Sequence, residues 1–523
     1  MAVKYAIQGG GNWSGSTWNT ADNQATSNTT APVAGDTANI TANCVAGVTV
    51  DVASACLVLD CTGFNSNLVM NNTVTVATGG TIKLPSGASG ALTGTSNIIS
   101  NGTLALTTNT KSIPALTWGT TGTKTITGDT TITGLMTVTG NTIINTGTIT
   151  LAGGMTLNAT LDGSSPLILT GGTWSGATAG LLCCSLSFAG NSTVSGMVYI
   201  YVSVHTCTLT YTSGTIDAST ATLNFAISGI TMNTGSNIRW GTISSPYVSN
   251  PTNVTLSSDL YCTNITSATN SYLTINSATY VVNCNGTIAS TTTTFNGTAD
   301  IMMTGTGAID STTNIWKCPI EINTAGTITI GRVLVQSAGI FKYTAGRVVS
   351  TGDTSGFQLS TGAKLDIGTI PTRINVSDIT NGTGSATLLS NLVVGKITML
   401  SLSSLITLTF TGAFDIDCTD VILTARTVLN VPTGRTISVS NSINTLPNAL
   451  YNPVIQTTSG TANLNYQGTP ANLETTGTTF TNLNASSSIM PIYTWFGTVT
   501  NCVNIYSVNG ADIGGSGLTL LIN

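Results

Sequence analysis

Short runs in which apolar and polar residues alternate recur along most of this chain. The alternation has a period of two, which places apolar side chains on one face of a strand and polar ones on the other. Gly- and Asn-rich turn signals such as Thr78-Gly79-Gly80 separate the runs. Many short strands with turns between them predict an all-β fold. The first such runs are 48–52, 73–76, 81–84, 103–106, 123–127, 130–133, 136–139 and 148–151.

The short length and steady recurrence of these runs favour a β-solenoid over a β-sandwich. Each coil of a solenoid buries its apolar face only against the neighbouring coils, so many short strands suffice. Weak self-similarity supports this, because Tyr211-Thr-Ser-Gly is echoed by Tyr343-Thr-Ala-Gly. At roughly 20–25 residues per coil, residues 46–450 would form on the order of 17–20 coils. We therefore expect a long β-helix shaft over residues 46–450.

The two ends of the chain differ from this shaft. Residues 1–45 carry Trp13 and Trp18, whose rings can cover the open apolar end of the first coil, so this segment is predicted to be a cap or an attachment segment. Residues 451–523 gain prolines and aromatic residues, and are predicted to form a C-terminal cap, an oligomerisation module or a binding tip. The candidate binding surface there consists of Tyr493, Trp495, Phe496 and Tyr506.

Composition narrows the range of partners. Only 6% of the residues are charged, far below the quarter or so of an ordinary domain. Stacked Thr, Asn and Ser side chains can hydrogen-bond between coils, whereas stacked like charges would repel. The 14 Lys and Arg residues form no cluster, so no nucleic-acid partner is expected. The longest apolar stretch, 388–414, is interrupted by Lys396 and by many Ser and Thr residues, so no membrane insertion is expected.

The N-terminus lacks the hydrophobic core of a signal peptide. This predicts synthesis in a cytoplasm without export by the usual route. The 11 cysteines follow no metal-site spacing, and we expect them to be buried free thiols. No metal or cofactor is expected.

Candidate catalytic residues are few. Asp415, Asp417 and Asp420 lie close together, and the first two share one face of a strand. Paired acids of this kind cleave polysaccharides, and their oxygens also suit calcium. No set of Arg, Lys, His or aromatic residues surrounds them to hold a sugar, so we treat them as weak candidates. The single histidine, His205, lies in an alternating strand without an orienting carboxylate nearby in sequence.

The opening Gly11-Asn12-Trp13-Ser14, a second Trp at 18, and then Pro32-x-x-Gly35-Asp36-x-x-x-Ile40, followed by short Thr- and Gly-rich strands, resembles the start of β-helical surface proteins. Such proteins occur among phage virion proteins and bacterial adhesins. The resemblance implies a right-handed parallel β-helix, often trimeric in phage fibres and tailspikes.

We therefore expect a non-enzymatic structural or adhesive component of a phage virion, either a head or tail fibre or a surface decoration protein. It would be made in the host cytoplasm and carried on the virion. Expected partners are capsid or tail proteins, a glycan or receptor on the host surface, and two further copies in a homotrimer. Two alternatives stay open: a polysaccharide-degrading enzyme of the tailspike type, and a bacterial adhesin or matrix filament subunit.

Overall fold

In the computed structural model the chain is an all-β protein whose parallel strands stack as a β-solenoid of about 19 turns. This confirms the predicted fold class. The chain divides into two compact units: unit 1 comprises Met1–Pro246 and Asn250–Tyr261, and unit 2 comprises Tyr247–Ser249 and Cys262–Asn523. The structure describes residues 1–86, 89–145, 147–177, 180–200, 207–226, 229–246, 252–268, 270–290, 293–310, 315–335, 339–350, 356–368, 374–378, 383–401, 404–447, 451–485, 490–493, 497–508 and 513–514.

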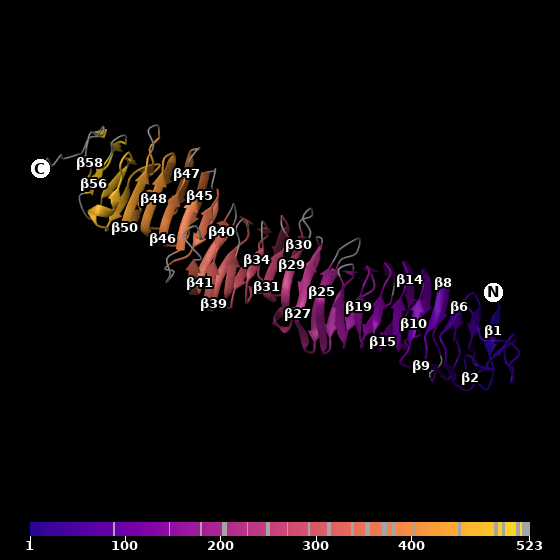
Figure 1. Ribbon diagram of the computed structural model, residues 1–523. Helices are drawn as coiled ribbons and strands as arrows, with labels where there is room; N and C mark the ends of the chain where they lie inside the picture. Colours follow the sequence, from indigo (N-terminus) through magenta and orange to yellow (C-terminus); the bar gives the residue numbers. More distant parts are fainter. Residues whose placement is uncertain are drawn as a thin grey trace. The chain divides into compact units, whose positions relative to one another are not determined.

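Unit 1 contains β1 to β30 and one short 3₁₀ helix, η1 (Gly235–Asn237); its strands follow one another along the stack in Figure 1. The strands are β1 (Val3–Ala6), β2 (Gly11–Asn12), β3 (Trp18–Asn19), β4 (Thr37–Asn39), β5 (Val48–Val50), β6 (Ser54–Asp60), β7 (Asn67–Met70), β8 (Val74–Lys83), β9 (Ala91–Gly94), β10 (Asn97–Ser100), β11 (Leu104–Thr107), β12 (Ser112–Ile113), β13 (Ala115–Trp118), β14 (Gly122–Thr127), β15 (Thr130–Ile132), β16 (Met136–Val138), β17 (Thr142–Asn145), β18 (Ile149–Leu151), β19 (Gly154–Leu157), β20 (Leu161–Gly163), β21 (Leu167–Leu169), β22 (Thr173–Gly176), β23 (Leu181–Cys183), β24 (Leu186–Ala189), β25 (Ser192–Ile200), β26 (Cys207–Ser213), β27 (Ile216–Phe225), β28 (Ile230–Asn233), β29 (Arg239–Ser245) and β30 (Thr252–Leu256).

The coils of unit 1 are three-sided where they are most regular. β13, β14 and β15 form one coil, and each pairs in parallel with its counterpart β16, β17 or β18 in the next coil. Met136 pairs with Met155, 19 residues later, and Met155 pairs with Trp174 after another 19. Side chains alternate inward and outward, as in β16, where Met136 and Val138 are buried and the Thr between them is not. The period-two pattern in the sequence therefore marks the inner and outer faces of each coil.

One predicted turn is a bend within a strand. Runs 73–76 and 81–84 were expected to be separate strands, but they form the two halves of β8, which pairs with β10 through its first half and with β11 through its second. Gly79 at the bend has a φ of +77°, which glycine adopts without strain. The sequence signal was therefore correct about the change of direction and wrong about the break in the strand.

The N-terminal segment closes the first coil of unit 1. β3 runs antiparallel to β1, on the side opposite the parallel partner β4, and the N–H groups of Asn28 and Thr29 donate to the carbonyl of Trp18 on the far side of β3. Trp13 and Trp18 are both fully buried, with ring centroids 4.7 Å apart, and the Trp18 indole donates to the Trp13 carbonyl. Another strand cannot extend the parallel stack at this edge, because β3 runs antiparallel and its outer side is already hydrogen-bonded to Asn28 and Thr29. This end is therefore protected against edge-to-edge association.

Unit 2 contains the remaining strands and the short 3₁₀ helix η2 (Pro470–Asn472); β31 (Leu260–Ser267) begins in unit 1 and ends in unit 2. The strands are β32 (Tyr272–Asn276), β33 (Val282–Cys284), β34 (Ile288–Ser290), β35 (Thr294–Asn296), β36 (Ile301–Met303), β37 (Gly307–Asp310), β38 (Ile315–Trp316), β39 (Ile320–Ile330), β40 (Arg332–Val335), β41 (Ile340–Ser350), β42 (Gly356–Leu359), β43 (Ala363–Asp366), β44 (Ile374–Asp378), β45 (Thr383–Leu388), β46 (Leu392–Met399), β47 (Ile406–Thr411), β48 (Ile416–Thr424), β49 (Thr427–Asn430), β50 (Thr436–Leu446), β51 (Val454–Gln456), β52 (Ala462–Tyr466), β53 (Leu473–Glu474), β54 (Thr479–Thr481), β55 (Leu483–Ala485), β56 (Met490–Tyr493), β57 (Val499–Thr500), β58 (Ile505–Val508) and β59 (Ile513–Gly514).

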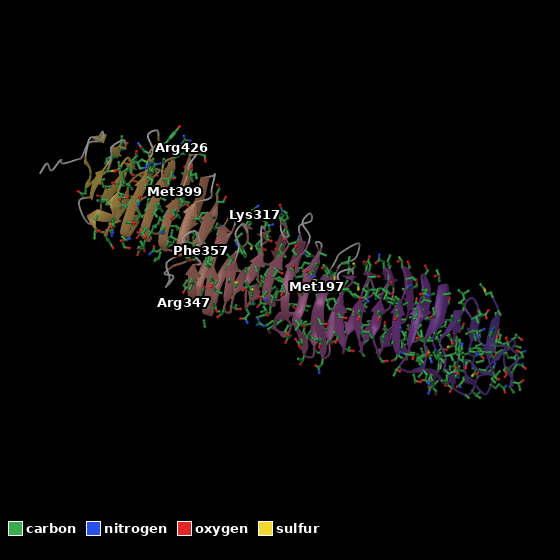
Figure 2. The ribbon with its side chains drawn as sticks, viewed as in Figure 1. Met197, Lys317, Arg347, Phe357, Met399 and Arg426 are labelled. Carbon is green, nitrogen blue, oxygen red and sulfur yellow. The ribbon has the colours of Figure 1, made fainter. Side chains whose placement is uncertain are left out.

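Pairs of aromatic side chains lie within the largely aliphatic core of unit 2. Phe295 and Trp316 are register partners in adjacent coils, and their rings stack with centroids 4.2 Å apart. Phe357, labelled in Figure 2, meets Phe341 edge to face at 4.3 Å, and both side chains are fully buried. Parallel pairing continues through β57 and β59. Parallel stacking therefore extends beyond residue 450 as well as before residue 46.

Outward-facing polar side chains form the expected ladders between coils. Asn430 donates to Thr409 of the preceding coil at 2.8 Å and accepts from Gln456 of the following coil at 3.0 Å. Thr387 and Thr411 are joined in the same way at 3.2 Å. These bonds need no charge, which accounts for a 6% charged composition in a chain that is polar on its outside.

The similar sequences that begin at Tyr211 and Tyr343 adopt the same local structure, one in each unit. The Tyr211 hydroxyl donates to the carbonyl of Gly214, and the Tyr343 hydroxyl donates to the carbonyl of Gly346, at 2.9 and 2.7 Å. Both glycines have a positive φ, +94° and +116°. The repeated sequence therefore encodes a corner held by a tyrosine hydroxyl. In the part of the chain that the structure describes, no helix is long and apolar enough to cross a membrane.

Candidate functional site

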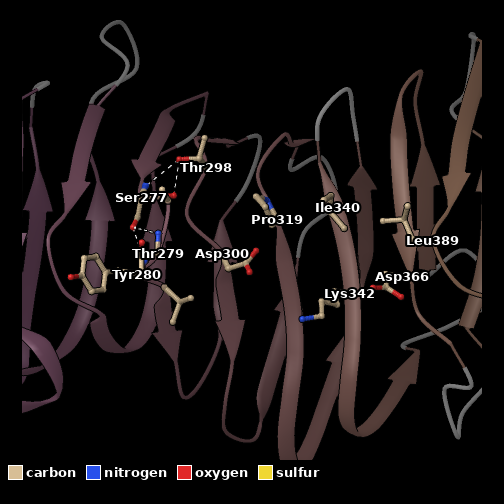
Figure 3. Close-up of a pocket in the computed structure, with 12 residues that line it drawn as sticks. Ser277, Thr279, Tyr280, Thr298, Asp300, Pro319, Ile340, Lys342, Asp366 and Leu389 are labelled. Atoms are coloured by element: carbon tan, nitrogen blue, oxygen red, sulfur yellow. Dashed lines mark hydrogen bonds between the residues drawn. The ribbon is translucent and has the colours of Figure 1, made fainter.

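A groove on the outer face of unit 2 brings several charged side chains together. It has a volume of about 310 Å³. Figure 3 shows its labelled side chains following one another across neighbouring parallel strands. The lining residues are Ser277, Ala278, Thr279, Tyr280, Val281, Thr298, Asp300, Pro319, Ile340, Lys342, Asp366 and Leu389.

Strand register determines which of these residues meet. Glu321 in β39 pairs with Lys342 in β41, and Lys342 pairs with Asp366 in β43, so three charged residues occupy one position in three successive coils. Asp300 immediately precedes β36, and β36 pairs with β39. The groove is therefore a shallow trough that runs along the stack and crosses several coils.

The centre of the trough is an ion pair. The Lys342 ammonium lies 3.0 Å from one carboxylate oxygen of Glu321, and the Thr344 hydroxyl donates to the other at 2.5 Å. Glu321 is only 3% exposed, whereas the Lys342 side chain is 44% exposed. The hydrogen bond to Glu321 raises the pKa of Lys342, burial acts against this rise, and the Asp300 and Asp366 charges add to it. This pair therefore satisfies a carboxylate that would otherwise be buried alone.

Two further carboxyl groups flank this pair. Burial raises the pKa of Asp300, the nearby Glu321 carboxylate raises it further, and Lys342 opposes the shift. Within the described ranges, neither the Asp300 nor the Asp366 carboxyl group makes a hydrogen bond or an ion pair. In Figure 3, Tyr280 lies on the side of Asp300 away from Lys342, and Tyr280 is 39% exposed. The trough thus presents two unengaged carboxyl groups and an aromatic ring beside a satisfied ion pair.

Asp415 and Asp420 hold neighbouring coils together. One Asp415 oxygen accepts from the backbone N–H of Thr436 at 2.9 Å, and the Asp415 N–H donates to the side chain of Asn391 at 3.1 Å. Asp420 accepts from the side chains of Asn441 and Ser442, at 2.8 and 2.6 Å. These contacts give both carboxylates a structural role between coils.

Asp417 lies in β48 between Val393 of β46 and Ser438 of β50, with its side chain half-buried.

The contact that Asp415 makes also occurs in unit 1, where Asp129 accepts from the backbone N–H of Thr148 at 2.9 Å. An acidic residue at a coil corner is therefore a recurring device of this chain, which is a sufficient reason for Asp415 to be present.

The other residues selected from the sequence fall in three groups. Trp13 and Trp18 lie in the core at the N-terminal end, as described above. Tyr493 and Tyr506 belong to β56 and β58, which pair in parallel. Trp495, Phe496 and His205 lie outside the described residues.

All 11 cysteines are free and buried, as the spacing predicted. Burial raises the pKa of Cys56, Cys183, Cys207 and Cys318 to about 12. A thiol with so high a pKa carries almost no thiolate at neutral pH, so it is a poor nucleophile. No group of three or more His, Cys, Asp or Glu side chains that could hold a metal ion occurs in the described parts of either unit.

We expect the folded protein to react very slowly with a disulfide reagent such as Ellman's reagent at pH 8. Fewer than about one thiol per chain should react in the first minutes, because the attacking thiolate is both scarce and covered. All 11 should react after unfolding in guanidinium. Rapid reaction of several thiols in the folded protein would contradict the burial of the cysteines.

Sequence reasoning did not find the trough, because its residues are far apart in the chain. Glu321, Lys342 and Asp366 are separated by 21 and then 24 residues. Because the coils differ in length, a sequence repeat of fixed length does not align these three residues. The scarcity of glutamate was the one available signal, since only Glu321 and Glu474 occur in the chain.

No protein-family model, no curated protein and no solved structure matches this chain.

Proposed function

We propose that this protein is a non-enzymatic structural and adhesive component of a phage virion, a head or tail fibre or a surface decoration protein. Its work would be mechanical: it holds a surface at a fixed distance and resists proteolysis. The observation that carries this proposal is the parallel β-solenoid of about 19 turns. The resemblance of residues 11–40 to β-helical surface proteins, which occur among phage virion proteins and bacterial adhesins, is consistent with this role.

The contacts between coils suit a mechanical role. Backbone hydrogen bonds join each strand to the strands of the next coil, and side-chain ladders such as Thr409–Asn430–Gln456 join the outer faces. A protease needs an extended, unpaired stretch of backbone, and paired strands do not supply one. Because the ladders are neutral, salt should weaken them little.

An inventory of purified particles tests this proposal. Particles banded on a density gradient from a lysate of the source culture should contain this chain at a constant ratio to the major capsid protein. Light scattering of the purified chain should give about three times 53.2 kDa if it forms the expected homotrimer. Recovery of the chain only with cells, and never with particles, would contradict the proposal.

A polysaccharide-degrading enzyme is the second candidate, favoured by the raised pKa of Asp300 beside a groove. A raised pKa suits a general acid. The distance to a second catalytic carboxyl group argues against this activity, because Asp300 and Asp366 are three coils apart, roughly 14 Å along the stack at about 4.8 Å per coil. Acid pairs of glycosidases lie roughly 5 to 10 Å apart. Release of reducing ends that Asp300→Asn abolishes would favour the enzyme; no release from a panel of bacterial polysaccharides would favour the structural role.

A further inference from the structure

The trough of unit 2 carries more negative than positive charge. Asp300, Lys342 and Asp366 line it, and the buried Glu321 is the register partner of Lys342, so three acidic residues stand against one lysine in a chain where charged residues make up only 6%. The nearest additional cation in sequence is Lys364, two residues before Asp366 on the same face of β43, and it does not line the trough. Anionic ligands would therefore be repelled here.

The two outer carboxyl groups differ from Glu321 in what they touch. Glu321 is satisfied by Lys342 and Thr344. Asp300 and Asp366 have no such donor among the residues that the structure describes. An unpaired carboxylate in partly desolvated surroundings gains most from a cation that brings its own hydrogen-bond donors.

The kind of cation follows from the geometry. A divalent metal needs several oxygen ligands around one point, whereas Asp300 and Asp366 are about 14 Å apart along the stack. A primary ammonium group needs one carboxylate and accepts further neutral partners. The Lys342 ammonium already sits against Glu321 in the same trough at 3.0 Å. The exposed Tyr280 ring and the apolar Pro319 and Ile340 side chains suit the carbon chain between two ammonium groups.

We propose that this trough binds extended organic cations bearing primary ammonium groups, with Asp300 and Asp366 each receiving one ammonium group. Polyamines and oligomers of unacetylated amino sugars share this chemistry. The inference goes beyond the structural role and does not depend on it, because a fibre or decoration protein can carry such a site or lack it.

Calorimetric titration of the whole chain with spermine at low salt tests the proposal. Asp300→Asn and Asp366→Asn should each weaken binding about fivefold, the upper range for a partly exposed ion pair. The double variant should lose about 25-fold if the two contacts are independent. Asp415→Asn is the matched control: it removes a carboxylate from the same unit and keeps the oxygen that accepts from Thr436, so binding should be unchanged. Fully acetylated spermine should not bind.

Equal affinity of spermine for the parent chain and the double variant would overturn the proposal, as would equal affinity for spermine and its acetylated form. Circular dichroism of each variant establishes that it is folded. A second measurement needs no variant: carbon NMR of the Asp300 carboxyl group should show its pKa falling when spermine is added. Titration with a glucosamine trimer and with its N-acetylated form distinguishes polyamines from amino sugars as ligands. Binding of the unacetylated trimer alone would show that the site also accepts amino sugars.

Discussion

Replacing Gly163 with alanine is expected to destabilise unit 1 by about 4 kcal/mol. Gly163 ends β20 and pairs with Ile144 of β17 in the preceding coil. A Cβ atom at this position would lie 1.9 Å from the Ile144 carbonyl oxygen, and φ is +136°. Forced overpacking costs about 1–3 kcal/mol, and the unfavourable φ adds about 1–2 kcal/mol. The obstructing atom belongs to a paired backbone, so it cannot move away without breaking the ladder.

Gly79→Ala is the matched control for this substitution. Gly79 also has a positive φ, +77°, but a Cβ atom there would meet nothing within 4 Å. Only the conformational cost remains, about 1 kcal/mol. Guanidinium unfolding of the full chain, followed by circular dichroism, compares the two variants. Equal destabilisation by both would show that the close approach of neighbouring coils at Gly163 is not as described.

Replacing Lys124 with methionine is expected to stabilise unit 1 at pH 7 by about 2 kcal/mol. Lys124 in β14 is 1% exposed, and its ammonium group donates to the carbonyl of Gly102. Burial lowers its pKa from 10.5 to about 8. A shift of this size corresponds to about 3 kcal/mol of cost for the charged form, and loss of the hydrogen bond returns about 1 kcal/mol.

The pH dependence gives a second signature of this residue. Between pH 8 and 10.5 the unfolded chain holds a proton on Lys124 that the folded chain has released, so stability should rise with pH across this window. Below pH 8 the full cost is present, and above 10.5 it is gone. Lys124→Met should remove this slope. Lys83→Met serves as the control, because Lys83 is 44% exposed and pairs with Asp60 at the surface, where a pair contributes about 1 kcal/mol or less. An unchanged slope in Lys124→Met would contradict the burial of its amine.

The sequence predicted the features of this fold that depend on neighbouring residues. Alternation in 130–133 and 136–139 located β15 and β16 to within a residue, because inward and outward positions alternate strictly within a strand. The same alternation puts Lys124 in phase with Ile126, on the face that the structure buries. The chain has about 19 turns, and the 17–20 coils were expected for residues 46–450 alone; parallel pairing also occurs before residue 46 and beyond residue 450.

Features that depend on the alignment of distant coils were not predictable from the sequence. Asp415 and Asp417 attracted attention because their shared face is visible from spacing alone. The column of Glu321, Lys342 and Asp366 depends on coils of unequal length, which a single sequence does not define. The bend of β8 was missed for a related reason: Gly79 and Gly80 can end a strand or bend it, and only pairing with β10 and β11 decides between them.

The most direct measurement of the central claim is electron microscopy of purified particles labelled with gold-tagged antibody against this chain. The proposed role places the chain on the outside of a virion, so gold should mark particle surfaces or projections at regular sites, and particles that lack the gene product should be unlabelled. Gold confined to cell surfaces or extracellular filaments, with bare particles, would contradict the virion role and favour an adhesin or matrix filament.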